Sequence, residues 1–407
     1  MRPSSSFLRV AALIVLGASL GAAPYASAGG GYKVLHSFGK GKDGAGVHAG
    51  LARDNQGSLY GATTGGGVYG YGTVFRLTPG SDGRWTETIL HSFCAIARCK
   101  DGASPSGVLL LDSDGDLFGA SNAATFEIKR KAGGENFLVL CDCVTPSVFD
   151  STGNLYGLGG PGTHNAGAVA ELSPGTDGWK ETLLYSFCSW PPNCRDGEPP
   201  EWGLSWDTAG NLYGTTEFGG DHGAPECNPN CGVVYQLQAL GGGKWKYHRI
   251  HSFAASPNDG VLPQYGVTVD PKGNVYGTTL YSVSTSGTVY ELSPQQDGRW
   301  KETILYAFPN PEKNGGAPAG GVTFDNLGNL YGTASAGGDP TCDCGVVFKM
   351  TPQANGKWSY TVLHRFKGTD GYGPGYNLIF DQDYKHLYGT TVAGGSGGYG
   401  VVYEITP

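Results

Sequence analysis

The sequence predicts an all-β fold, a seven-bladed β-propeller with four antiparallel strands in each blade. The first observation behind this prediction is composition. The 407 residues include 70 Gly and 24 Pro, and only 15% are charged. Glycine inside a helix costs roughly 1 kcal/mol relative to alanine, so this chain disfavours helices. No Gly-X-Y period occurs, which excludes collagen. With 8 Trp, 23 Tyr and 16 Phe, the chain is also too aromatic to be disordered.

The second observation is an aromatic–glycine motif that occurs seven times. An Asp precedes each copy, with a Gly three residues after the Asp in the first six copies. Asp hydrogen-bonds to the backbone ahead of it and Gly supplies positive φ, so this spacing predicts a tight turn between two strands. The aromatic residues are Tyr60, Phe118, Tyr156, Tyr213, Tyr276, Tyr331 and Tyr388. The aspartates are Asp54, Asp112, Asp150, Asp207, Asp270, Asp325 and Asp381.

The third observation is that each copy contains four strand-like runs. We call them strands A to D, with residues 203–207 (A), 211–216 (B), 72–77 (C) and 85–93 (D) as examples. All are short, rich in β-branched and aromatic residues, and bounded by Gly, Pro or Asp, which is typical of strands. Four strands in a period of about 54 residues indicate a propeller blade.

The two ends of the chain predict how the ring closes. Residues 32–38 form a lone D-type strand, and the last run before Pro407 is a C-type strand. If the first strand completes the last blade, every blade has four strands and no edge is left exposed. An open solenoid is the alternative, and it would leave an odd strand at each end.

The repeat resembles the GloVer tandem repeat of exported bacterial proteins. The resemblance rests on Asp-x-x-Gly-Asn-Leu-Tyr-Gly-Thr-Thr, Gly-Thr-Val-Phe-x-Leu-Thr-Pro and Trp-x-Glu-Thr-x-Leu-x-Ser-Phe, and it covers residues 32–407. Copies two and three depart most: Phe126 lies in a reduced strand C, and residues 168–170 lack the aromatic residue. The resemblance implies an exported protein of propeller-like repeats and transfers no catalytic residue.

Residues 1–28 are predicted to be a secretory signal peptide. Arg2 and Arg9 form the basic region, residues 10–23 are apolar, and Ala26-Ser27-Ala28 offers a cleavage site. The apolar run is shorter than the roughly 20 residues of a spanning helix. We therefore expect a secreted or periplasmic protein, with residues 29–407 forming a single monomeric propeller domain that does not interact with membranes.

Ten cysteines form five local pairs, which predicts disulfides in an exported protein. Zinc is the competing interpretation, but no pair has a paired Cys-x2-Cys framework. Cys141 and Cys143 could instead bond to a neighbouring loop, because bridging residues i and i+2 strains the preferred geometry. We expect all ten in or at the edge of the long connections between strands. The pairs are Cys94/Cys99, Cys141/Cys143, Cys188/Cys194, Cys227/Cys231 and Cys342/Cys344.

Charge excludes one class of partner. The formal net charge is −8 and basic residues do not cluster, whereas nucleic-acid binding requires clustered Lys and Arg. No nucleophile elbow, phosphate loop or zinc-protease motif occurs either.

Loop lengths predict the functional face. The A–B and C–D turns are short and uniform, whereas the B–C and D–A connections are long and varied, and variable loops on a rigid scaffold carry function. The most decorated stretch joins blades three and four. Its exposed Trp could stack on a sugar ring, and its acids and His could serve acid/base chemistry. The alternative is that the Trp residues pack the loops and the acids are solvated. The candidates are Trp190, Glu198, Glu201, Trp202, Asp221, His222 and Glu226.

Two recurring positions are predicted to be structural. A histidine recurs near the end of strand D, at His36, His91, His251 and His364. An Asp-Gly pair precedes strand A at Asp43, Asp101, Asp196, Asp259 and Asp370. These aspartates form turns; the alternative is that they ring the channel and hold Ca²⁺. No residue is assigned as a metal ligand.

Together these features predict an exported binding or scaffold module for an extracellular polysaccharide or protein. The alternative is a lyase, glycosidase or lactonase with its site at the channel mouth.

Overall fold

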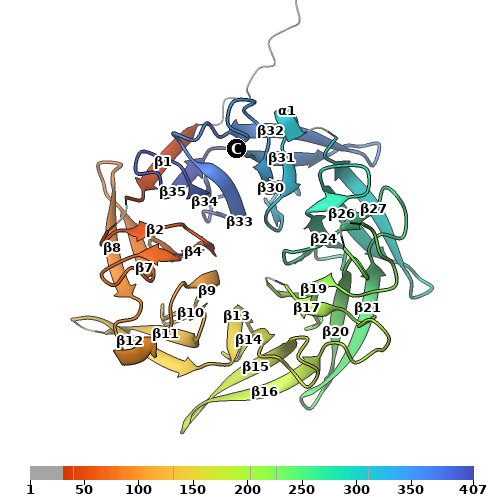
Figure 1. Ribbon diagram of the computed structural model, residues 1–407, viewed down its shortest axis with the longest axis horizontal. Helices are drawn as coiled ribbons and strands as arrows, with labels where there is room; N and C mark the ends of the chain where they lie inside the picture. The colour runs from red at the N-terminus through yellow and green to blue at the C-terminus, as the bar shows by residue number, and fades with distance from the viewer. Residues whose placement is uncertain (1–30, 40, 132, 202, 226, 310) are drawn as a thin grey trace, which may run out of the picture.

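A closed ring of seven small antiparallel sheets surrounds a central channel, which confirms the predicted all-β, seven-bladed propeller (Figure 1). The computed structural model describes residues 31–407 except residues 40, 132, 202, 226 and 310. The predicted signal peptide therefore lies outside the described residues. No described helix is long and apolar enough to cross a membrane.

The blades follow one another along the chain, each with strand A innermost and strand D outermost. Blade one comprises β4 (Ala52–Arg53), β5 (Leu59–Thr63), β7 (Thr73–Pro79) and β8 (Trp85–Ser92). Blade two comprises β9 (Ser106–Leu111), β10 (Leu117–Ser121), β11 (Ala124–Lys131) and β12 (Gly134–Cys141). Blade three comprises β13 (Val144–Phe149), β14 (Leu155–Gly159), β15 (Ala168–Gly175) and β16 (Gly178–Ser186). Blade four comprises β17 (Glu198–Pro200), β18 (Ser205–Trp206), β19 (Leu212–Phe218), β20 (Val233–Gly241) and β21 (Lys244–Ser252).

The remaining blades repeat this order. Blade five comprises β23 (Thr268–Val269), β24 (Val275–Thr279), β26 (Thr288–Pro294) and β27 (Trp300–Ala307). Blade six comprises β28 (Gly316–Pro318), β29 (Thr323–Phe324), β30 (Leu330–Ala336), β31 (Val346–Pro352) and β32 (Trp358–Arg365). Blade seven comprises β33 (Tyr372–Phe380), β34 (Leu387–Ala393), β35 (Val401–Ile405) and β1 (Tyr32–Ser37). Small additions are β2 (Gly44–Ala45), β3 (Ala49–Gly50), β6 (Gly65–Gly66), η1 (Ala97–Cys99), β22 (Gly260–Val261), β25 (Tyr281–Ser282) and α1 (Pro311–Asn314).

The ring closes as the sequence predicts. Strand β1 pairs antiparallel with β35, with Tyr32 opposite Ile405 and Val34 opposite Tyr403. The two ends of the chain thus share one sheet, β1-β35-β34-β33. This pairing removes the free edge of β35, on which another chain could otherwise pair.

The hydrophobic core is divided among the blade interfaces. Tyr60 of blade one, for example, packs with Leu109, Leu117 and Phe126 of blade two. In blade two the expectation of a reduced strand C is wrong, because β11 is eight residues long. What is short there is the connection between β10 and β11, which leaves strand C intact.

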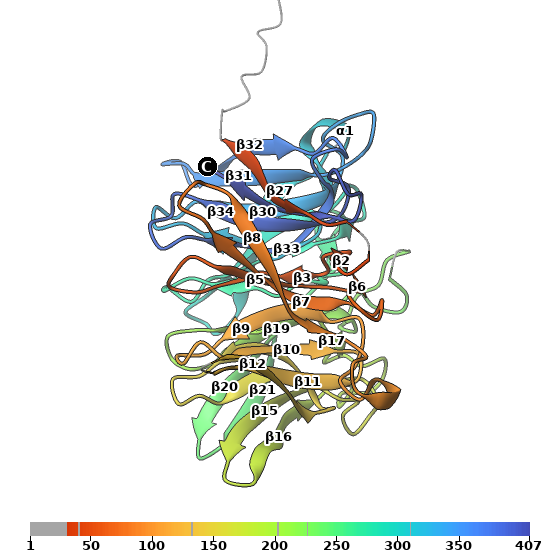
Figure 2. The same ribbon diagram turned by 90° about the vertical axis from the view of Figure 1, so that its left-hand side faces the viewer.

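The two faces of the ring differ as predicted. The long B–C and D–A connections, which we call the loop face, stand on one side, where β2 and β6 are seen in Figure 2. Loops of neighbouring blades are joined there by hydrogen bonds such as that from Gly46 N to Tyr399 O.

All five predicted disulfides form, and each joins the two cysteines of one local pair. The Cys-x-Cys pairs are included, so the alternative that Cys141 bonds to a neighbouring loop is wrong, and the thiolates are not zinc ligands. Five disulfides indicate folding in an oxidising compartment. The bridges are Cys94–Cys99, Cys141–Cys143, Cys188–Cys194, Cys227–Cys231 and Cys342–Cys344.

Cys99 lies in the long D–A connection between β8 and β9, as the sequence predicts. Cys99 is the last residue of η1, a short 3₁₀ helix between β8 and β9. The Cys99 carbonyl accepts a hydrogen bond from Gly102 N (2.8 Å). The carboxylate of Asp101 accepts bonds from the N–H groups of Ala95 (2.9 Å) and Ile96 (3.1 Å). The connection winds around this carboxylate, and Arg98 and Cys99 adopt positive φ there (65° and 49°).

Cys344 is also part of the hydrophobic core, which its place in a long connection does not indicate. Cys344 lies between β30 and β31, as expected, but its side chain is buried and belongs to the hydrophobic cluster that contains Phe366 and Tyr403. Its carbonyl accepts a hydrogen bond from Gly373 N of blade seven (3.0 Å). The residue is therefore part of the interface between blades six and seven, a contact across blades that spacing in the sequence does not reveal.

Candidate ligand-binding face

Exposed aromatic rings are concentrated on the loop face. Among the described residues, seven large aromatic side chains are exposed, and Tyr384, in the A–B turn of blade seven, is the one on the opposite face. Apolar residues scattered on a surface are common, so the observation that matters is that these rings gather on one face. The six on the loop face are Tyr69, Tyr71, Trp190, Tyr281, Tyr372 and Tyr399.

Trp190 is held in place by a buried carboxylate. It lies between β16 and β17, inside the loop closed by the Cys188–Cys194 disulfide. Asp196 is fully buried, and its side chain accepts hydrogen bonds from the backbone N–H groups of Ser189 (2.8 Å) and Trp190 (3.0 Å). The same carboxylate accepts a bond from the Tyr185 hydroxyl (2.7 Å). Asp196, the aspartate of the recurring Asp-Gly pair, therefore holds this loop in place.

The indole of Trp190 is half open to solvent. It is 41% exposed, and its inner edge packs against Tyr247, with ring centroids 5.2 Å apart and planes at 81°. The guanidinium carbon of Arg249 lies 5.9 Å from the indole centroid. A partly exposed indole next to a guanidinium offers both a flat apolar surface and hydrogen-bond donors.

Asp221 links two arginines beside this indole. Its side chain forms an ion pair with Arg195, at 2.6 Å from Nε, and a second ion pair with Arg249. Arg249 also donates to the Arg195 carbonyl (2.7 Å). Although burial acts to raise it, the hydrogen bonds from Arg195 and Arg249 hold the pKa of Asp221 below its ordinary value. The predicted candidates Trp190 and Asp221 are thus brought together through Arg249.

Two other predicted residues, Glu198 and Glu201, lie on the segment that leads into blade four. Glu198 lies on β17, and burial, with the nearby charge of Asp196, raises its pKa. Glu201 follows in the same extended segment, bonded through its N–H to Thr215 O (2.9 Å). A carboxylate oxygen of Glu198 lies within 4.8 Å of both sulfurs of the Cys188–Cys194 disulfide, which closes the loop that carries Trp190.

His222 is exposed, and its carbonyl accepts a hydrogen bond from Cys231 N (3.0 Å). Trp202 and Glu226 lie outside the described residues.

Side chains from three blades meet near the centre of the ring. A hydrogen bond of 3.3 Å joins the Tyr376 hydroxyl and His48 Nδ1. Burial, together with the charge of Glu201, raises the pKa of Tyr265 to about 12. The cavity between Tyr265, Tyr376 and Asn377 measures ≈ 20 Å³, about the space of one water molecule. Sequence reasoning did not place His48, Tyr265 or Tyr376 together, because they belong to three different blades.

The recurring Asp-Gly aspartates do not ring this channel. Asp101 Oδ2 lies 2.9 Å from His91 Nε2, and Asp370 Oδ2 lies 3.0 Å from His364 Nε2. Both histidines are on strand D, the outermost strand of the blade. The aspartates are turn formers, as predicted, and the alternative of a Ca²⁺ ring at the channel is wrong.

Arg249 is the residue of this face that sequence reasoning missed. Its signal is a departure from the repeat, since the same position of strand D is apolar in other blades, at Ile89, Leu183, Ile304 and Val362. Pattern searches that look for what copies share do not find such exceptions.

Solved structures support the fold. YCF48 from Cyanidioschyzon merolae is 11% identical, with coverage of 92% of this chain and 99% of that chain and a TM-score of 0.53. The extracellular domain of the hybrid two-component system BT4673 from B. thetaiotaomicron is 11% identical, with coverage of 89% and 40% and a TM-score of 0.50. At these identities the likeness shows the propeller fold alone. Comparison with curated proteins finds no match.

The sequence also matches a family model described as the Gloeobacter/Verrucomicrobia repeat. The matched regions are residues 143–308 and 282–407, which overlap and together run from blade three to the end of the chain. This confirms the resemblance on which the repeat motif was assigned: the chain belongs to the Gloeobacter/Verrucomicrobia repeat family.

Proposed function

We propose that this protein is an exported propeller that binds an extracellular glycan on its loop face. The observation that carries the proposal is the segregation of exposed aromatic rings, six on the loop face against Tyr384 on the other among the described residues. A rigid ring would present these side chains at fixed positions, so little order would have to be gained on binding.

A glycan suits this surface better than a protein does. The rings stand on separate glycine-rich loops, such as residues 65–72, which carry Tyr69 and Tyr71, and residues 394–400, which carry Tyr399. A stable protein interface buries roughly 800 Å² on each partner around an apolar centre. A sugar ring is smaller, with an apolar C–H face for an indole or phenol and hydroxyl groups for Arg195 and Asp221.

A location outside the cytosol agrees with the paired cysteines. Ten paired cysteines are typical of a secreted or periplasmic protein, and residues 1–28 carry the pattern of a signal peptide. The mature propeller would act as a monomer free of the membrane.

The enzyme alternative has less support. The cavity among Tyr265, Tyr376 and Asn377 measures ≈ 20 Å³, well below the roughly 300–1,000 Å³ of substrate pockets. Two hollows of that size lie elsewhere, ≈ 430 Å³ beside Cys143 and ≈ 420 Å³ beside Trp206, and neither is lined by Glu198, Glu201 or His222.

A glycan array followed by titration of the best binder tests the proposal. Trp190→Ala and Tyr71→Ala should each weaken binding about tenfold or more, because each removes a stacking surface. Tyr384→Ala is the matched control: its ring is 42% exposed, against 41% for Trp190, but lies on the other face. Affinity that falls only in the control would place the site elsewhere. Absence of any glycan ligand, or capture of a protein in its place, would overturn the glycan class.

A further inference from the structure

The ends of strands D make a repeated contact between neighbouring blades. The histidine or tyrosine near the end of one strand D meets a side chain on strand D of the next blade. At four interfaces that side chain is an aromatic ring stacked nearly parallel, with centroids 3.7–4.4 Å apart. These pairs are His364/Tyr32, His91/Phe137, Tyr185/Tyr247 and Tyr306/Tyr360.

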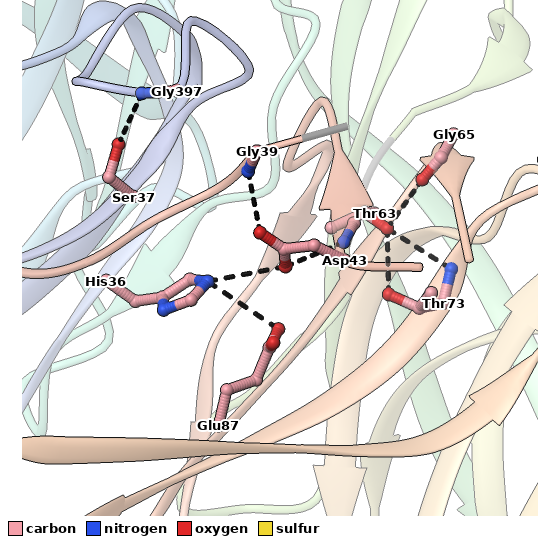
Figure 3. Close-up of polar contacts among 10 residues, drawn as sticks. His36, Ser37, Gly39, Asp43, Thr63, Gly65, Thr73, Glu87 and Gly397 are labelled. Carbon is pink, nitrogen blue, oxygen red and sulfur yellow. Dashed lines mark hydrogen bonds and ion pairs between the residues drawn. The ribbon is translucent and has the colours of Figure 1, made fainter. Parts of the chain in front are cut away.

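At two interfaces a glutamate replaces the aromatic ring. Between blades seven and one, His36 Nε2 lies 3.4 Å from Asp43 Oδ1 and 3.7 Å from Glu87 Oε1 (Figure 3). Between blades four and five, His251 Nε2 lies 3.3 Å from Asp259 Oδ1 and 3.7 Å from Glu302 Oε1. In each group the three atoms all lie within 4.8 Å of one another. The same arrangement thus occurs twice.

The glutamate oxygens have no hydrogen-bond donor of their own. Oε1 of Glu87 and Oε1 of Glu302 are shielded from solvent and lack a hydrogen-bond partner. Burial raises the pKa of both glutamates above the ordinary value. A buried acceptor next to a second carboxylate is costly unless a positive group compensates it.

The other two ligand atoms are held in place by their surroundings. Asp43 Oδ2 accepts a bond from Gly39 N (2.6 Å), and Asp259 Oδ2 accepts one from Ala255 N (2.8 Å), which leaves Oδ1 turned toward the histidine. The histidine rings pack edge-on against Phe38 and Phe253, at 4.5 and 4.7 Å between centroids. Partners that orient ligands in this way are a usual feature of metal sites.

Distance and donor type select the metal. Ligand atoms about 2.1 Å from a tetrahedral ion stand about 3.4 Å apart, close to the 3.3–3.7 Å between each histidine nitrogen and its two carboxylate oxygens. One imidazole nitrogen and two carboxylate oxygens are ligands that Zn²⁺ accepts, whereas Ca²⁺ prefers oxygen alone. We propose that His36, Asp43 and Glu87 form one Zn²⁺ site and that His251, Asp259 and Glu302 form a second.

Each site would join two blades. His36 lies on β1, the strand that closes the ring, and Glu87 lies on β8 of blade one. A bound ion would tie the closing strand to the first blade, and the second ion would tie blade four to blade five. Water would take the fourth position. Sequence spacing did not reveal these sites, because each set spans two repeat units.

Zinc stoichiometry tests this directly. The mature protein, free of any purification tag, is stripped with a chelator and titrated with Zn²⁺ by calorimetry. We expect two Zn²⁺ per chain and a melting temperature raised by several degrees. Co²⁺ in the same sites should give the visible absorption of tetrahedral nitrogen and oxygen coordination.

Variants assign the sites. Glu87→Tyr and Glu302→Tyr install the aromatic residue that stacks on histidine at other interfaces, so each should fold and bind one Zn²⁺ fewer; the double variant should bind none. Glu181→Gln is the matched control, since Glu181 occupies the same position of strand D in blade three, where Cys141 stands in place of the histidine. It should retain two. Fewer than two Zn²⁺ in the wild-type protein, or an unchanged stoichiometry in the double variant, would overturn the proposal.

Discussion

At the scale of single residues, the glycine after the aromatic residue of strand B explains much of the repeat. A Cβ added to Gly61 would lie 2.3 Å from Cζ of Phe75, and one added to Gly332 would lie 2.5 Å from Cζ of Phe348. The aromatic ring of strand C therefore lies directly over this glycine. In blade three strand C has Ala170 instead of an aromatic residue, and there the backbone of Thr145 approaches Gly157, with its oxygen 2.1 Å from the added Cβ.

Gly332→Ala tests this close packing. The ring of Phe348 is fully buried, so it cannot move aside, and overpacking of this kind costs about 2 kcal/mol. Urea unfolding measures the loss. Gly160→Ala is the control, because its added Cβ meets nothing within 4 Å and its cost should stay within about 0.5 kcal/mol. Equal losses in both variants would contradict the packing explanation.

At the scale of elements, the A–B turn is the most regular unit. In blade six Asp325 Oδ1 accepts bonds from the N–H groups of Leu327 and Asn329, both 2.9 Å. Its Oδ2 accepts bonds from the Asn329 amide (2.7 Å) and the Tyr331 hydroxyl (3.0 Å). The turn aspartate thus also anchors the strand-B tyrosine, which is why the Asp and the aromatic residue keep a fixed spacing in the sequence.

The charge of Asp325 should make this turn sensitive to acid. Although burial acts to raise it, the bonds from Asn329 and Leu327 hold the pKa of Asp325 below its ordinary value. A lowered pKa stabilises the folded state above the unfolded value of about 3.9, and this stability is lost as pH falls through the folded pKa. Asp325→Asn should therefore cost about 1 kcal/mol at pH 7 and less at pH 3.

Urea unfolding at the two pH values measures this difference. Asp383→Asn serves as the control, since Asp383 is an exposed residue of the A–B turn in blade seven with a side chain 69% exposed. Its cost should stay within about 0.5 kcal/mol at both pH values, as is usual for a surface substitution. A cost for Asp325→Asn that persists undiminished at pH 3 would rule out the charge as its cause.

At the scale of the whole molecule, closure by β1 determines whether the seven blades form a ring. The strand adds pairing to β35, and Phe38, fully buried just after it, packs 5.0 Å from Phe75 of blade one. Closure therefore connects blade seven to blade one through the core as well as through the sheet.

A chain that starts at Gly39 tests closure. Loss of β1 and Phe38 should lower the melting temperature by about 10 °C or more and expose the edge of β35, which should promote association between chains. Calorimetry and size-exclusion chromatography measure the two effects. A chain that starts at Gly31 keeps β1 and should match the full mature protein. A monomeric Gly39 chain with an unchanged melting temperature would show that closure contributes little.

Local pattern predicted the fold well because a propeller blade is assembled from neighbours in the chain. The turn at Asp54, the glycine at Gly61 and the pairing of Cys188 with Cys194 all involve residues close in sequence. The candidate site was predicted only in part. Trp190 and Asp221 were named, but Arg249, which joins them, is an exception to the repeat and lies on a different strand.

By itself the sequence determined the all-β class, the seven blades, the closing strand and the five disulfide pairs, because each depends on a spacing that recurs along the chain. Only the tertiary structure decided which side chains meet across blades. It placed Tyr265 near Tyr376, buried Cys344 between blades six and seven, and placed Glu87 against His36. Such contacts depend on the angle and distance between successive blades, which are set by the packing of all seven and leave no periodic trace in the sequence.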